Sequence, residues 1–259
     1  MENPAFLSDF NLLGSNSTII DKGSFMVIKT KDNPTYMGGN FLLLKTPPKN
    51  SEKNKIEKLF KENFESDVVK SHIAFSWEKE PSDLSDFMTN GYEYITHSVL
   101  TMKPSDFILP SKTNSEITIE LIDTPSKWGK WILNEIDERP ESISKSDFTA
   151  FIKNRARFFK EQSRKGNGEF YGAFLENRLV GSVGFFIYNR VGRFQIVRTI
   201  NEFRRKYICN SLLKFILLEN ASKIDTAVIV TDKNYVALNL YKKLGFKETH
   251  IQYELIKKL

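Results

Sequence analysis

The chain has very little cysteine and histidine. Its 259 residues include one cysteine, Cys209, and three histidines, His72, His97 and His250. A single cysteine cannot form an intramolecular disulfide, which fits a reducing compartment, and we expect a cytoplasmic protein. The histidines lack the spacing of metal ligands, so the sequence does not predict a structural zinc site or any other metal centre.

Long hydrophobic runs are also missing. No apolar stretch reaches the ~18 residues that a membrane span needs, and the N-terminus lacks the basic and apolar segments of a secretory signal. We therefore expect no membrane partner. The net charge is +6, from 38 basic and 32 acidic residues. This surplus suits a phosphorylated small ligand but is too small to favour nucleic acid as a partner, and the oligomeric state stays open.

Hydrophobic periodicity predicts alternating strands and helices. Helical spacing covers residues 51–64, 126–136 and 144–164, and strand patterns lie at 25–30, 40–45, 72–77, 94–102, 117–122, 169–175, 179–188 and 193–199. Residues 1–24 show little periodicity. The pattern predicts an α/β (α+β) protein with a central sheet and helices on its faces.

Turn-forming residues at 104–115 predict a domain boundary, with domains at 1–110 and 115–259. A short internal match spans this boundary. Phe87 stands four residues before Gly91-Tyr92, just as Tyr241 stands four residues before Gly245-Phe246, and a strand follows both. A true structural repeat and a chance match both remain open from the sequence.

A basic turn precedes the helix that follows strand 193–199. Arg204, Arg205 and Lys206 stand where the helix exposes free N–H groups and the positive end of its dipole. Cations are unfavourable there unless an anion arrives from outside, so the turn predicts a phosphate site. The alternative is an ordinary solvated basic surface.

A second helix is expected from Asn234, capped by Asp232 or Asn234 and stopped by Gly245. On such a helix Asn234, Ala237 and Tyr241 would share one face, which suits the lining of a cleft. The alternative is that Tyr241 is a core aromatic whose hydroxyl reaches the surface.

These residues resemble the GCN5-related N-acetyltransferase (GNAT) family over about residues 169–255. Six of them, Arg204-Arg205-Lys206-Tyr207-Ile208-Cys209, align with the family's pyrophosphate loop, Arg/Gln-x-x-Gly-x-Gly/Ala. The later family element Asn-x-x-Ala-x-x-Leu-Tyr-x-x-x-Gly-Phe matches Asn234, Ala237, Leu240, Tyr241, Gly245 and Phe246. The N-terminal half resembles the first half of a subgroup with two joined GNAT halves.

The resemblance implies a mostly antiparallel GNAT sheet with helices on both faces, preceded by a smaller, degenerate N-terminal half. It implies transfer of an acetyl group from acetyl-coenzyme A to an amine of a small molecule or peptide by direct attack. Backbone groups near Val197 and Thr199 would hold pantetheine, the loop amides of residues 204–209 and Asn234 would complete the cofactor site, and Tyr241 would be the general acid. Glu202 and Asp147 are candidate bases.

The chain departs from the family pattern at two loop positions. Tyr207 replaces a glycine, which puts cofactor affinity in doubt, and Cys209 replaces a small residue. In the first half Phe87 stands where Tyr241 stands in the second, and a phenyl ring cannot donate a proton. Two alternatives follow: a non-catalytic coenzyme A-binding or scaffold protein, and an aminoacyl transferase.

Overall fold

The computed structural model describes residues 3–12, 17–141 and 143–259, and the chain divides into two compact units. Unit 1 contains residues 1–99, 230–238 and 248–259, and unit 2 contains residues 100–229 and 239–247. The chain therefore enters unit 1 three times. The first segment of unit 1 ends at residue 99, shortly before the boundary predicted at residues 104–115. The limits of the separately folding domains stay a prediction.

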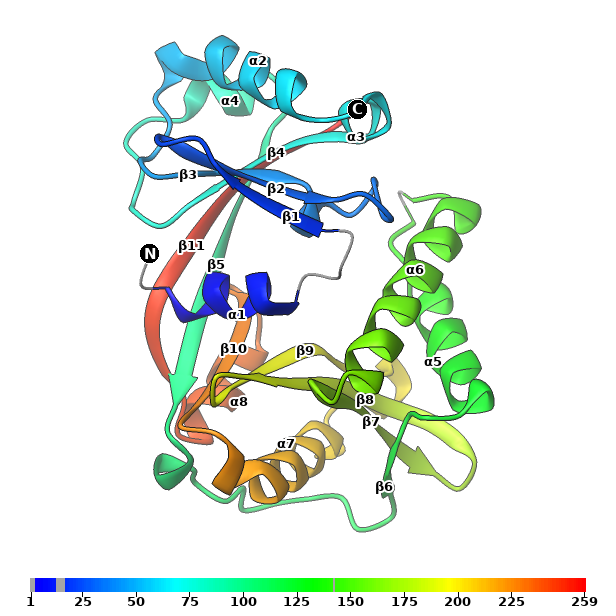
Figure 1. Cartoon of the computed structure of the whole chain (residues 1–259). Coiled ribbons are helices and arrows are strands. Elements are labelled where there is room, and N and C mark those ends of the chain that lie inside the picture. Colours follow the sequence, from blue (N-terminus) through cyan, green and yellow to red (C-terminus); the bar gives the residue numbers. More distant parts are fainter. Residues whose placement is uncertain (1–2, 13–16, 142) are drawn as a thin grey trace. The chain divides into compact units, whose positions relative to one another are not determined.

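Unit 1 is a sheet with the strand order β1-β2-β3-β4-β11-β5 (Figure 1). Its strands are β1 (Ser17–Asp21), β2 (Phe25–Thr30), β3 (Phe41–Leu44), β4 (His72–Trp77), β5 (Glu93–Met102) and β11 (Lys247–Lys258). Its helices are α1 (Pro4–Leu12), α2 (Lys53–Asn63), α3 (Ser66–Ser71) and α4 (Ser85–Thr89), with short 3-10 turns at Met37–Gly39 and Asn50–Glu52. Residues 1–24 thus contain α1 and β1, which their weak periodicity did not predict.

The larger core of unit 1 lies between the sheet and α2. Ile56 and Phe60 of α2 pack onto Phe75 and Trp77 of β4, and Leu255 of β11 completes the cluster. β11 pairs antiparallel with β4 from Tyr253 opposite Trp77 to Lys258 opposite His72. The last strand of the chain is therefore an inner strand of the sheet that the first hundred residues begin.

Unit 2 has the strand order β10-β9-β8-β7-β6. Its strands are β6 (Thr118–Leu121), β7 (Gly168–Leu175), β8 (Arg178–Tyr188), β9 (Val191–Thr199) and β10 (Thr226–Asp232). Its helices are α5 (Pro125–Asp137), α6 (Lys145–Arg164), α7 (Ile208–Asn220) and α8 (Ala237–Lys243), with 3-10 turns at Pro104–Asp106, Asn201–Phe203 and Ala221–Lys223. The last residues of β10 (230–232) and the first of α8 (237–238) belong to unit 1. β6 to β9 form an antiparallel meander, and β9 pairs in parallel with β10.

Helices cover both faces of the unit 2 sheet (Figure 1). On one face Phe159 of α6 stacks on Phe186 of β8, at 5.5 Å between ring centroids. On the other face α7 approaches β8 so closely that a Cβ on Gly181 would lie 2.8 Å from Ile208. The predicted α/β class, with a mostly antiparallel sheet, is confirmed. Among the described residues, no helix is long and apolar enough to cross a membrane.

Candidate cofactor site and active site

The strand expected to hold pantetheine, β9, carries a bulge. Its register against β8 shifts between Ser182 and Gly184. There Ile196 and Val197 together oppose one β8 residue, and Ile196 adopts a φ of +46°. A bulge of this kind bends a strand and redirects its backbone groups.

β9 pairs with β10 over only three residues, 191–193 with 226–228. Its later residues, including Val197 and Thr199, extend beyond this short ladder. Ile200 N–H donates to Val180 O of β8 at 3.0 Å, which directs every second backbone group toward β8. By alternation, the backbone groups of Thr199 face the opposite edge, where an extended ligand chain can pair with the N–H. The Thr199 carbonyl accepts a hydrogen bond from Arg204 Nε.

The basic turn after β9 contains two residues with left-handed backbone. Arg205 has a φ of +62°, and Tyr207 has a φ of +59° and a ψ of +16°. Tyr207 stands where the family pattern has glycine, and it adopts the backbone conformation that glycine adopts most readily. Its side chain is 44% exposed, and Lys112 Nζ lies 5.6 Å from the ring centroid.

Helix α7 begins at Ile208 with no capping side chain among the described residues and no acidic residue in its first turn. Its first N–H groups and its dipole are therefore available to an anion. Glu202, an acid in the turn before this helix, is engaged by Arg178 at 2.8 Å, which holds the pKa of that carboxyl below its usual range. The residues present fit a pyrophosphate.

The other predicted loop residues surround this helix start. Arg204 Nε donates to Thr199 O at 3.3 Å, Arg205 and Lys206 are exposed, and Ile208 is buried beneath the helix. Burial raises the pKa of the Cys209 thiol to about 12, so the thiol stays protonated near neutral pH. This agrees with Cys209 as a small packing residue.

Sequence reasoning missed the segment that fixes this turn. Asn114 Nδ2 donates to Lys206 O at 3.0 Å, and Asn114 N–H donates to Ser211 Oγ at 2.9 Å. Asn210 Nδ2 donates in turn to Lys112 O at 2.9 Å. The sequence predicts only a domain boundary for the segment 104–115, because it shows turn-forming residues there but not which groups they bind.

Tyr241 is buried on α8, where the helix ends in a Schellman motif. Phe246 N–H donates to Tyr241 O and Gly245 N–H donates to Lys242 O, both at 3.2 Å, and Gly245 has a φ of +101°. The predicted helix stop at Gly245 is confirmed. Phe246 contacts both the Tyr241 ring and Phe194 of β9, at 6.3 and 6.2 Å between centroids. One aromatic side chain thus connects the predicted acid to the predicted cofactor strand.

The expected helix start is wrong. α8 begins at Ala237, so Asn234 lies in the exposed turn before it and does not share a helical face with Tyr241. Asp232 Oδ1 accepts a hydrogen bond from Asn234 N–H at 2.7 Å, and Tyr235 N–H donates to Asp232 O at 3.1 Å. Asp232 therefore forms a separate turn before the helix. A role for Asn234 in cofactor binding remains a proposal.

The two candidate bases have structural partners. Glu202 binds Arg178, and Asp147 accepts a hydrogen bond from Ser144 Oγ at 2.6 Å in the N-terminal turn of α6. Sequence reasoning missed a third carboxyl, Glu135 of α5, which is only 3% exposed. Burial raises the pKa of Glu135 to about 7, although the nearby Arg198 guanidinium opposes this shift.

The internal sequence match is also a structural match. In unit 1, Tyr92 N–H donates to Phe87 O and Gly91 N–H donates to Met88 O, both at 3.1 Å, and Gly91 has a φ of +84°. α4 therefore ends in the same Schellman motif as α8. Phe87 is fully buried, at 5.4 Å between its ring centroid and that of Tyr92. The unit 1 copy keeps the fold of the motif without the hydroxyl.

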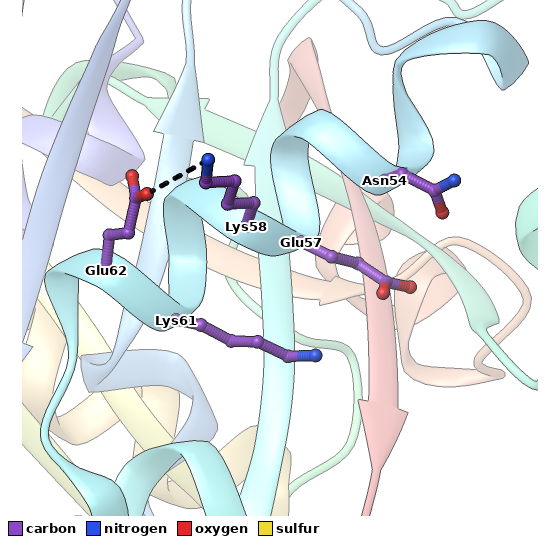
Figure 2. A pocket seen from close by; sticks show the side chains of 5 residues that line it. All are labelled: Asn54, Glu57, Lys58, Lys61 and Glu62. Carbon is purple, nitrogen blue, oxygen red and sulfur yellow. Dashed lines mark ion pairs between the residues drawn. The ribbon is translucent and has the colours of Figure 1, made fainter.

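The lysine-rich helix α2 has a hollow on its surface (Figure 2), lined by Asn54, Glu57, Lys58, Lys61 and Glu62. Lys58 and Glu62 form an ion pair at 3.8 Å between two largely exposed side chains. Mixed charges on one exposed helix face are typical of an ordinary solvated surface. We therefore place the candidate site at the start of α7.

Comparison with known protein families gives a match over part of the chain. Residues 132–246 match the model of the acetyltransferase (GNAT) family. The chain therefore carries a GNAT domain, which confirms the resemblance. No curated protein sequence matches the chain.

Several solved structures have a similar fold over almost the whole chain. A functionally unknown conserved protein from Staphylococcus epidermidis shares 16% identity and a TM-score of 0.75, covering 96% of this chain and 97% of its own. A GCN5-related N-acetyltransferase from Kribbella flavida shares 11% identity and a TM-score of 0.65, covering 99% and 95%. A tandem GNAT protein from the clavulanic acid pathway shares 10% identity and a TM-score of 0.58, covering 98% and 86%.

Proposed function

We propose that this protein is an acetyl-coenzyme A-dependent N-acetyltransferase that acts on a primary amine of a small molecule or peptide. The observation that carries the proposal is the run from the bulged strand β9 through the left-handed turn at Tyr207 into the uncapped start of α7. This run offers outward-facing backbone groups along a strand and then an anion site. The membership in the GNAT family supports it. Its single cysteine supports a cytoplasmic location.

The chain's own residues have distinct roles in this proposal. Backbone groups of Val197 and Thr199 bind the pantetheine arm, and the amides of residues 204–209 bind the pyrophosphate with help from the basic side chains. When bound, acetyl-coenzyme A supplies the thioester from which the acetyl group passes to the amine. The Tyr241 hydroxyl donates a proton to the leaving sulfur, whose thiol has an ordinary pKa of about 8.5 against about 10 for a phenol.

Calorimetric titration of the full chain with acetyl-coenzyme A tests the first step. We expect one site per chain with a dissociation constant in the micromolar range, on the order of −8 kcal/mol. A titration without heat at millimolar ligand would overturn the proposal.

Tyr241→Phe tests the acid. With an amine panel and detection of the released thiol, kcat should fall by about 100-fold, since general acids contribute on the order of 10²–10⁴. The dissociation constant for acetyl-coenzyme A should stay within about threefold. The control is Tyr188→Phe, because Tyr188 is the last residue of β8 and its hydroxyl donates to Gln162 Oε1. Equal turnover of the two variants would remove Tyr241 from the acid role.

A further inference from the structure

Two carboxylates at the C-terminal end of α5, one in its last turn and one on its C-cap residue, hold the segment that joins β9 to the basic turn. Arg198 Nη1 donates to Glu138 Oε2 at 3.1 Å, and Asn201 N–H donates to Glu138 Oε1 at 2.7 Å. Arg198 Nε lies 2.8 Å from Glu135 Oε1, an ion pair whose angle falls short of a well-formed hydrogen bond. Glu135 and Glu138 are three residues apart and so share one helix face. We call these four residues the α5 clamp.

The α5 clamp acts on the part of β9 that matters for the proposed cofactor site. Arg198 stands between Val197 and Thr199 in the strand, and its side chain points to the α5 face. Asn201 opens the 3-10 turn that leads to Arg204 and α7. The clamp therefore holds the end of β9 from the side of the sheet that α5 covers. None of its contacts is to the backbone of Val197 or Thr199.

Fold stability alone does not account for this arrangement. Glu135 is almost fully buried, and taking a carboxylate out of water costs about as much as an ion pair returns. An apolar contact would pack α5 on β9 at a lower cost. The clamp instead fixes an orientation, because each carboxylate oxygen of Glu138 accepts a hydrogen bond. One comes from the Arg198 side chain and the other from the Asn201 backbone N–H.

We propose that Glu135 and Glu138 are positioning residues for the cofactor: through Arg198 and Asn201 they order the end of β9 and the turn at 204–209 before acetyl-coenzyme A binds. This inference rests on the proposed function. A site that is already ordered loses less entropy on binding, so its ligand binds more tightly. Loss of the clamp should weaken cofactor binding and leave the chemistry at saturation nearly unchanged.

The test uses Glu138→Gln and Arg198→Met in the full chain. Each should raise the dissociation constant of acetyl-coenzyme A about tenfold by calorimetry, with kcat at saturation within about twofold. Hydrogen exchange of amides 199–209 in the free protein should quicken about tenfold and slow again at saturating acetyl-coenzyme A. Both variants remove the charged contact between Arg198 and Glu138, one from each partner, so the second serves if the first fails to fold.

A matched control lies at the other end of β9. Arg190 and Asp225 form an exposed two-point ion pair, with distances of 2.9 and 2.8 Å. Asp225→Asn removes an arginine–carboxylate ion pair far from the clamp and should leave both readouts unchanged. Unchanged binding and exchange in Glu138→Gln and Arg198→Met, or equal effects of Asp225→Asn, would overturn the inference.

The two proposals can fail separately. If the wild-type chain binds acetyl-coenzyme A and the clamp variants bind it equally well, the positioning role is wrong and the proposed function stands. If the wild-type chain does not bind it, the proposed function is wrong. The exchange measurement then decides whether the clamp orders residues 199–209, and unchanged exchange would overturn that as well.

Discussion

Replacing Gly245 by alanine should destabilise the protein more than the same change at Gly91. Both glycines end a helix in the same Schellman motif with positive φ, +101° and +84°. Alanine at either position pays a similar backbone penalty of about 1–2 kcal/mol. The surroundings differ: a Cβ on Gly91 has nothing within 4 Å, whereas a Cβ on Gly245 would lie 2.2 Å from the carbonyl oxygen of Asp106.

The extra cost at Gly245 follows from that contact. Carbon and oxygen need more than 3 Å, so the backbone at Asp106 or Gly245 has to shift by about 1 Å. Such a shift disturbs the hydrogen bond from Ile108 N–H to Leu244 O, now 3.0 Å long and worth about 1 kcal/mol. With the strain of the displaced backbone, Gly245→Ala should cost about 3–4 kcal/mol and Gly91→Ala about 1–2 kcal/mol.

Urea unfolding followed by circular dichroism measures both costs, and hydrogen exchange locates them. Faster exchange should appear at residues 241–247 in Gly245→Ala and at residues 87–93 in Gly91→Ala. The thermal midpoints should differ by about 4–8 °C, at about 2–4 °C per kcal/mol for a chain of this size. Equal losses of stability in the two variants would show that the reasoning from the Asp106 contact is wrong.

Two further predictions concern Glu135 and Tyr207. The pKa of Glu135 rises from about 4.5 to about 7 on folding, so the folded state holds this proton more tightly, and the group's contribution to stability is greatest below pH 4.5 and falls as pH rises through 7. Glu135→Gln should remove this slope and stabilise the protein by about 1–3 kcal/mol at pH 8.5, with little change at pH 5, in urea titrations at both pH values; parallel profiles of variant and wild type would contradict it. Tyr207→Gly should change stability by less than about 1 kcal/mol and the dissociation constant for acetyl-coenzyme A by less than tenfold, because the backbone already has the glycine-like conformation and the side chain is exposed. A larger gain in affinity would mean that Tyr207 obstructs the cofactor and would favour the non-catalytic reading.

Local pattern was enough to predict most of the fold. The expected helices at 126–136 and 144–164 correspond to α5 and α6, because their apolar residues repeat at the helical period over several turns. The predicted start of α8 is wrong for a reason that is also local. Asp232 accepts a hydrogen bond from Asn234 N–H and so stabilises a turn in place of the first helical turn. In a sequence, Asp232 and Asn234 look equally suitable as the N-cap residue, so the pattern does not distinguish a turn from a helix start.

The site could be predicted only where its residues are close in sequence. The turn at 204–209 and the Tyr241–Phe246 motif are continuous segments, so a motif reveals them. Glu138 and Arg198 are far apart in the chain, and nothing in either local sequence indicates that α5 lies on the end of β9. The left-handed conformation of Tyr207 also depends on its surroundings, since tyrosine alone disfavours it.

The place of β11 has a consequence for how the protein is made. Unit 1 needs β11 between β4 and β5, and Tyr253 and Leu255 supply part of its core. These residues leave the ribosome only after residues 100–229 and 239–247 of unit 2. Residues 1–110, expressed alone, would therefore leave β4 and β5 without the strand that joins them. The order of synthesis therefore places the completion of unit 1 after the synthesis of unit 2.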